Sequence, residues 1–261
     1  MRSLVRAAFS AFLVSVRLRV ISPWAYLTWL VFPLLFAAVG LYLLARPGAP
    51  SAHLAYGVLG GGLIAYWSIA YLDGGNGIQD ERWNGTLEQI FAVPTPLWAI
   101  ILGKISGSLL FGLVSFLPTA ALAYFGFHAV LPDLDAARFA ISLGVLTFTF
   151  FAIALTLTPL FALWRWAFSM LNGFELGVYV LCGFMFPIAV LAPQVQAVAA
   201  VLSPTWATRA LYASATSGSA RDITIWWIVA IALSALYLVA AYFMYAMVER
   251  QARVSGQLAL Q

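Results

Sequence analysis

The sequence predicts an all-α integral membrane protein, on the basis of its composition and the lengths of its apolar stretches. Hydrophobic residues fill 64% of the 261 positions and charged residues only 8%, whereas a soluble domain is about half apolar and about a quarter charged. The mean hydropathy is +0.96. So much apolar surface has to face lipid, which excludes a soluble, a disordered or a collagen-like chain.

Six stretches are long and apolar enough to cross a bilayer, which takes about 20 helical residues. They run from Trp24 to Leu44, Leu54 to Leu72, Ile105 to Phe125, Phe139 to Leu163, Phe168 to Val190, and Ile223 to Val248. Strands of a membrane barrel would instead show short segments of alternating polarity. We therefore expect six transmembrane helices and, because six is even, both termini on one side.

The positions of Lys and Arg predict that this side is the cytoplasm. Of the 13 basic residues, only Arg46, Arg138, Arg209 and Arg221 would then lie outside. An excess of Lys and Arg in cytoplasmic segments is the usual arrangement. The basic residues are scattered rather than gathered in a stripe, so no nucleic-acid partner is expected. Cys182 is the single cysteine, which excludes an intrachain disulfide.

Residues 1–22 predict an amphipathic helix that lies in the membrane interface. At about 100° per residue, Arg2, Arg6 and Arg17 share one arc, and Val5 and Phe9 lie on a neighbouring face. Such a helix rests its apolar side on the acyl chains and keeps its charges among the headgroups. Arg17 also interrupts the apolar stretch, and no small-residue cleavage site follows, which argues against a signal peptide.

Residues 73–96 form the one substantial cytoplasmic loop of this topology and hold five of the chain's charges. Thr86 and Gln89, three residues apart, make a capping-box pattern that begins a helix. Pro94 ends it. A helix this short is not stable alone, so it needs a surface on which to dock.

Leu87, Ile90 and Phe91 would form an apolar ridge on one side of that short helix, because residues at i, i+3 and i+4 share a face. Two interpretations compete. The loop is either a solvated connector that rests the ridge on the membrane surface, or a coupling helix that fits a groove in a separate cytoplasmic subunit.

One motif in this loop carries a family resemblance. It reads Glu81-Arg82-x-x-Gly85-Thr86-Leu87-Glu88, and Pro94 and then Gly103-Lys104 follow it. This pattern resembles the signature of bacterial type-2 ABC exporter permeases, in particular the daunorubicin-resistance and nodulation-factor-export type. The chain length, the six spans and the proline-punctuated segment 191–222 before the last span are similar to that family's plan. Glu175, inside the fifth span, departs from it.

The resemblance implies a single permease domain, residues 1–261, in a bacterial plasma membrane. It would export a hydrophobic or amphipathic drug, lipid or lipid-linked glycan by alternating access. Its implied partners are membrane lipid, a second permease chain, identical or different, and two ATP-binding cassette subunits that hold ATP and Mg. No cofactor is expected on this chain, because Gly103-Lys104 lacks the rest of a phosphate loop.

The same resemblance assigns ATPase coupling to residues of the loop. Leu87, Ile90 and Phe91 would dock, charge pairs of Glu81, Arg82 and Glu88 would fix the register, and Gly85 would give the sharp turn. The full predicted set is Glu81, Arg82, Gly85, Thr86, Leu87, Glu88, Ile90, Phe91 and Pro94.

Glu175 supports two hypotheses, because an ionisable residue inside a span is costly unless it faces protein or water. It either lines the translocation path or pairs across the bundle, with Arg165 as one partner, or it lies at the cytoplasmic headgroups because the true span begins later. A path carboxylate would also suit a rival function, an ion-gradient-driven secondary transporter. A more remote rival is an intramembrane enzyme, but the chain offers no catalytic motif and no metal-ligand cluster.

Small residues predict where helices pack closely. Gly57 with Gly61, and Gly103 with Gly107, are small-xxx-small pairs of the kind that let helices approach in lipid. Segment 191–222 is too short and too broken to cross the membrane again. The family resemblance implies an external re-entrant segment with two half-helices, and the alternative is a plain external loop with a buried hydrophobic stretch.

Overall fold

The computed structural model describes residues 2–44, 51–78, 81, 85, 96–129, 131, 133–164 and 171–255, and the regular structure within them is helical. The helices are α1 (Arg2–Ile21), α2 (Pro23–Tyr26), η1 (Leu27–Val31), α3 (Phe32–Leu44), α4 (Ser51–Asn76), α7 (Leu97–Val114), α8 (Phe116–Ala121), η2 (Leu122–Gly126), α9 (Ala136–Leu163), α11 (Leu171–Leu181), η3 (Ile188–Val190), α12 (Pro193–Ala199), α13 (Ser203–Ala215) and α14 (Ala220–Ser255).

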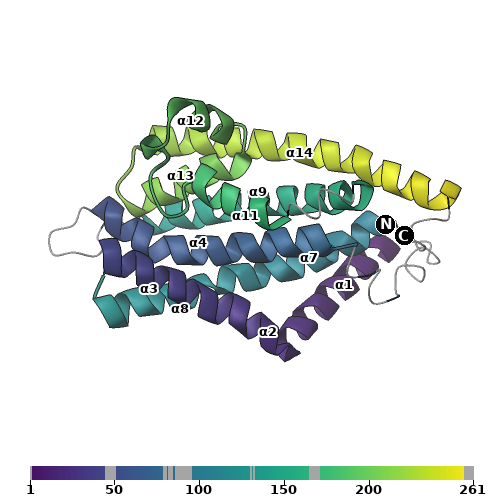
Figure 1. Cartoon of the computed structure of the whole chain (residues 1–261), viewed down its shortest axis with the longest axis horizontal. Coiled ribbons are helices and arrows are strands. Elements are labelled where there is room, and N and C mark those ends of the chain that lie inside the picture. Colours follow the sequence, from purple (N-terminus) through teal and green to yellow (C-terminus); the bar gives the residue numbers. More distant parts are fainter. Residues whose placement is uncertain are drawn as a thin grey trace.

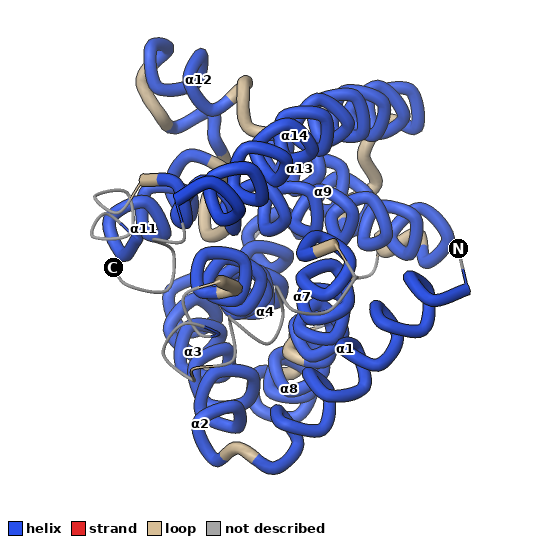
Figure 2. The backbone as a smooth tube through the Cα atoms, turned by 90° about the vertical axis from the view of Figure 1, so that its right-hand side faces the viewer, coloured by secondary structure: helices blue, strands red, loops and turns tan. Residues whose placement is uncertain are grey.

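The long helices lie side by side, and α12 and α13 sit at one end of the bundle (Figure 1). We call this end the α13 end. Viewed along the bundle, α4 is central and is surrounded by α3, α7, α9 and α11, all of which contact it (Figure 2). The fold is therefore built around α4.

Four helices of the described part are long and apolar enough to cross a membrane: His53–Gly74, Leu97–Gly126, Ala136–Leu163 and Ala220–Val248. They correspond to the second, third, fourth and sixth predicted spans. An all-helical chain with several such helices is what a multi-pass membrane protein requires. The prediction of an all-α membrane protein holds at this level.

The first predicted span, Trp24 to Leu44, is divided rather than continuous. A π-helical turn, η1, separates α2 from α3, which begins at Phe32. Pro33 follows directly and has no N–H to donate to the preceding turn, which is a common cause of a break in helical geometry. The apolar helix Phe32–Leu44 is shorter than a full crossing.

The predicted continuous helix from Phe168 to Val190 is wrong in its second half. Residues 165–170 lie outside the described part, and α11 ends at Leu181. Gly183 follows with φ +67°, a left-handed conformation that terminates helices and that glycine adopts without strain. From Gly183 to Val190 the chain is irregular apart from the short 3-10 turn η3. The length of the apolar run therefore predicted a helix that is too long.

Two short helices, α12 and α13, lie within segment 191–222. Each has proline in its first turn, Pro193 and Pro204, where the missing N–H costs nothing. The position of this segment outside the membrane stays a prediction.

The predicted glycine seams are confirmed as helix contacts. A Cβ on Gly61 would lie 2.5 Å from the carbonyl oxygen of Pro33 in α3, and one on Gly103 would lie 2.1 Å from that of Ala8 in α1. Neither position has room for a side chain. A third contact went unpredicted: a Cβ on Gly112 of α7 would lie 2.0 Å from the ring of Tyr66 in α4.

Helix α1 has two different sides. Its small residues Ala8, Ala11 and Ser15 meet the glycines of α7, whereas the large apolar side chains of Val5 and Phe9 are exposed. The interfacial placement of residues 1–22 stays a prediction. The structure adds that this helix packs on α7 as well.

Candidate functional site

Most of the predicted coupling residues lie outside the described part of the chain. These are Arg82, Thr86, Leu87, Glu88, Ile90, Phe91 and Pro94. Two of the set are described. Gly85 has φ +66°, a conformation that favours glycine in turns, and a Cβ there would meet nothing within 4 Å.

Glu81, at the start of the loop, is bound to the helix that follows the loop. Its Oε1 lies 2.5 Å from Nζ of Lys104 on α7, and both side chains are mostly buried. Partial burial limits screening by salt and water, so such a pair holds its geometry better than a fully exposed one. The ion pair joins Glu81, in the first part of the loop, to α7, the helix that follows the loop.

A second ion pair fixes the end of α4 from which the loop departs. The guanidinium of Arg19 on α1 donates to the carboxylate of Asp73 on α4, and both side chains are again mostly buried. On the same helix, Ser15 donates through its Oγ to the carbonyl oxygen of Lys104, at 3.1 Å. Helix α1 is therefore bonded to both helices that flank the loop.

Glu175 on α11 lies in a polar cluster with Ser68 of α4 and Tyr179 of its own helix. The hydroxyls of Ser68 and Tyr179 donate to Oε1 of Glu175 at 2.6 Å and 2.5 Å, and the two hydroxyl oxygens are themselves 2.5 Å apart. The carboxylate thus has two donors, which offset part of the cost of removing its charge from water.

Aromatic rings border this cluster. Tyr71 stacks on Phe174, with ring centroids 5.8 Å apart, and on Trp67 at 5.4 Å. Trp67 and Tyr71 are fully buried, while Ser68 and Glu175 are half-buried. The carboxylate of Glu175 therefore lies beside a group of aromatic rings between α4 and α11.

The side of α4 that bears Ser68 continues to the α13 end. Tyr56 and Gly60 lie twelve and eight residues before Ser68, so at about 100° per residue the three spread over an arc of about 120° on one broad side of the helix. Tyr56 packs on Tyr212 of α13 with ring centroids 4.0 Å apart. A Cβ on Gly60 would lie 2.9 Å from the carbonyl oxygen of Phe184. We call this strip, from Tyr56 to Ser68, the α4 face.

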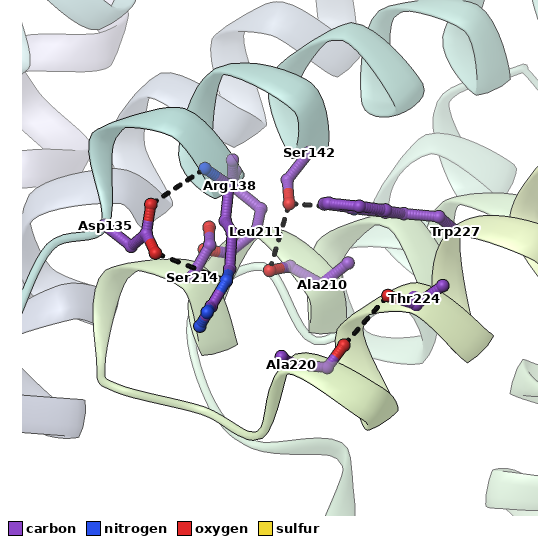
Figure 3. Close-up of polar contacts among 9 residues, drawn as sticks. All are labelled: Asp135, Arg138, Ser142, Ala210, Leu211, Ser214, Ala220, Thr224 and Trp227. Carbon is purple, nitrogen blue, oxygen red and sulfur yellow. Dashed lines mark hydrogen bonds and ion pairs between the residues drawn. The ribbon is translucent and has the colours of Figure 1, made fainter.

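Helix α13 is fixed firmly above that face. Figure 3 shows Ser142 of α9 donating to the carbonyl oxygen of Ala210 (3.3 Å) and accepting from Nε1 of Trp227 on α14 (2.9 Å). The backbone N–H of Asp135 also donates to the carbonyl oxygen of Ser214. Helix α13 is thus hydrogen-bonded to α9 at two points and packs against both α9 and α14, while Trp227 ties α14 to the same serine of α9.

Sequence reasoning identified Glu175 but not its partners. Tyr179 could have been found, because residues four apart share a helix face. Ser68 could not, because it lies 107 positions away and only the packing of α4 on α11 brings it close. Arg165, the predicted charge partner, lies outside the described residues.

No protein-family model matches the chain, and no curated protein matches it.

Proposed function

We propose that this chain is the transmembrane permease subunit of an ATP-driven exporter of the type-2 ABC class. It would cross a bacterial plasma membrane six times with both termini in the cytoplasm. A second permease chain would complete the pathway, and two ATP-binding cassette subunits would bind ATP and Mg. The cargo would be hydrophobic or amphipathic.

The observation that carries this proposal is the bonding at the base of loop 73–96. The ion pair Arg19–Asp73 joins α1 to α4, the hydrogen bond from Ser15 to the carbonyl oxygen of Lys104 joins α1 to α7, and the ion pair Lys104–Glu81 joins α7 to the loop itself. A force applied to the loop by a subunit docked beneath it therefore acts on three helices at once. A passive connector would need no such bonds.

The direction of the helices supports the proposed topology. The start of α1 and the end of α14 lie at the same end of the bundle, opposite the α13 end (Figure 1). An even number of crossings has this consequence. In the proposal, that end is cytoplasmic and the α13 end is external.

The α4 face is the part of the path that this chain would contribute. It runs from the Glu175 cluster toward α13, and aromatic rings of α4, α11 and α13 line it. Loop movement driven by ATP would tilt α4 against α11 and open the face alternately to each side. Apolar cargo needs such an aromatic surface more than it needs charged groups.

The decisive experiment is co-purification with an ATP-binding cassette subunit from the same organism, followed by reconstitution. We expect the wild-type complex to show vanadate-sensitive transport. Replacing both Leu87 and Phe91 with aspartate should abolish association, because the docking ridge would carry two charges. The matched control is Leu134→Asp, an exposed apolar position at the start of α9. Association that survives in the double variant would overturn the coupling role.

The Glu175 cluster favours one second candidate, the secondary transporter. Three oxygens lie within 2.6 Å of one another, yet the two hydroxyls supply only two hydrogens. A proton delivered to Glu175 would complete the set, as a proton relay requires. Transport in proteoliposomes driven by a pH gradient, without any ATPase and lost in Glu175→Gln, would favour this function over the exporter.

A further inference from the structure

Arg209 is a half-buried cation in the middle of α13, beside the outer part of the α4 face. Its guanidinium carbon lies 5.0 Å from the centre of the Trp206 ring. The ring is itself fixed, because Nε1 of Trp206 donates to the carbonyl oxygen of Ala200 at 2.8 Å. Tyr56 of α4 stacks on Tyr212, which lies three residues after Arg209 on α13, and this contact brings Tyr56 to the part of α13 that carries the arginine.

Within the described part of the chain, Arg209 has no carboxylate partner. The ion pairs there join Arg19 to Asp73, Lys104 to Glu81, and Arg138 to Asp135. Arg209 also makes none of the side-chain hydrogen bonds found among these residues. A partly desolvated guanidinium without an anion is costly, and a cation–π contact offsets only about 0.5–2 kcal/mol.

The other acids of the described part do not fill this gap. Asp133, Glu175 and Asp222 form no ion pair with Arg209. In the sequence, Asp80 and Glu88 come after the far end of α4, and the twenty residues from Tyr56 to Asn76 span about 30 Å of helix. Within the described part of the chain the site therefore lacks an anion, and one from outside can complete it.

We propose that Arg209 binds the anionic headgroup of an amphipathic cargo, a phosphate or a carboxylate, while Trp206 and Tyr56 contact the apolar part beside it. This inference rests on the proposed transport function. A guanidinium offers five N–H donors in a planar fork, which fits two oxygens of either group. The hydrogen bond from Ser142 of α9 to the carbonyl oxygen of Ala210 fixes the backbone next to Arg209 (Figure 3).

The charges along the α4 face give the headgroup a direction. Glu175 lies at the Ser68 end, and Arg209 lies at the Tyr56 end, about 18 Å further along the helix. An anionic headgroup is repelled by the first group and attracted by the second. The face therefore favours an anion at the external end over one at the Glu175 end.

The test is direct binding to the purified chain in nanodiscs of phosphatidylcholine. The probes are dioctanoyl phosphatidylglycerol, neutral dioctanoylglycerol and inorganic phosphate. We expect Arg209→Gln to weaken phosphatidylglycerol binding about tenfold or more, as loss of a charge-assisted hydrogen bond does, and to leave dioctanoylglycerol unaffected. Arg209→Lys should restore only part of the affinity, because it keeps the charge and loses the fork.

Arg221→Gln is the matched control, since Arg221 is an exposed arginine at the same end of the bundle and undergoes the same loss of charge. Equal weakening by both variants would overturn the proposal, as would unchanged binding in Arg209→Gln with an unchanged melting temperature. Inorganic phosphate that competes as well as the lipid would overturn the amphipathic cargo. Binding that depends on Arg209 without any ATP-dependent transport would instead refute the exporter and leave the anion site standing.

Discussion

Helices α4 and α14 are both long and apolar enough to cross a membrane, yet they have opposite surroundings. Of the most apolar part of each, 83% of α4 is buried inside the protein and only 17% of α14. Helix α4 buries Tyr66, Trp67 and Tyr71 completely, whereas Ile228 and Phe243 of α14 are each 62% exposed. Hydropathy predicts a membrane-spanning helix in both cases, but it does not tell which of the two carries functional polar side chains.

This difference shows that a membrane-spanning helix can carry polar side chains where it is buried among other helices. Ser68 of α4 has a partner in Glu175, while α14 presents apolar side chains to lipid and packs on α9 and α13 along one side. Polar groups are tolerated in a membrane where other protein groups satisfy them. Matched substitutions in the two regions should therefore have unequal effects.

The largest contrast is expected between two identical glycine substitutions. Gly61→Ala places a Cβ 2.5 Å from the carbonyl oxygen of Pro33, so α3 and α4 must separate. We expect a loss of about 1–3 kcal/mol, the usual cost of overpacking. Gly144→Ala, in α9, meets nothing within 4 Å and should leave stability unchanged or slightly higher. Thermal unfolding in detergent measures both, and equal melting temperatures would contradict the tight seam.

A smaller contrast is expected between two serines. Ser68→Ala removes one of the two donors to Glu175 and should cost about 1–3 kcal/mol, since a half-buried carboxylate is left with the Tyr179 hydroxyl alone. Ser234→Ala in α14 removes a buried hydroxyl that has no partner within the described part, so stability should be unchanged. The same unfolding assay applies. A larger loss for Ser234→Ala would mean that this hydroxyl makes a stabilising contact of its own.

The smallest contrast concerns charges near the loop. A double-mutant cycle of Arg19→Gln and Asp73→Asn should give a coupling energy of about 0.5–1 kcal/mol, as expected for a partly exposed pair. Arg250→Gln, an exposed arginine near the end of α14, should change stability by less than about 0.5 kcal/mol. A coupling energy of zero would contradict a stabilising ion pair between α1 and α4, and with it the proposed transmission of force from the loop.

Much of the helical architecture could be predicted because composition and hydropathy act locally. The four long spans correspond to predicted ones, and Gly61 and Gly103 marked real seams. The errors have local causes too. Apolarity runs on past Leu181, but the backbone turns at Gly183, and a hydropathy window cannot register a positive φ.

The contacts of the candidate site depend on distant parts of the chain, and this is why they escaped prediction. Lys104 was seen as part of a motif, but its bond to Glu81 requires the loop to fold back on α7. Arg209 was counted only as a charge that sets orientation. Its significance is that no described carboxylate pairs with it. Only the three-dimensional positions of the acidic side chains reveal this.

The close contact of Tyr66 with Gly112 has a mechanical consequence for the whole bundle. The Tyr66 ring occupies the space of a missing side chain on α7, and its hydroxyl donates to Oγ1 of Thr147 on α9 at 2.9 Å. Because one side chain of α4 is held by both α7 and α9, these three helices resist sliding along one another at this level of the bundle.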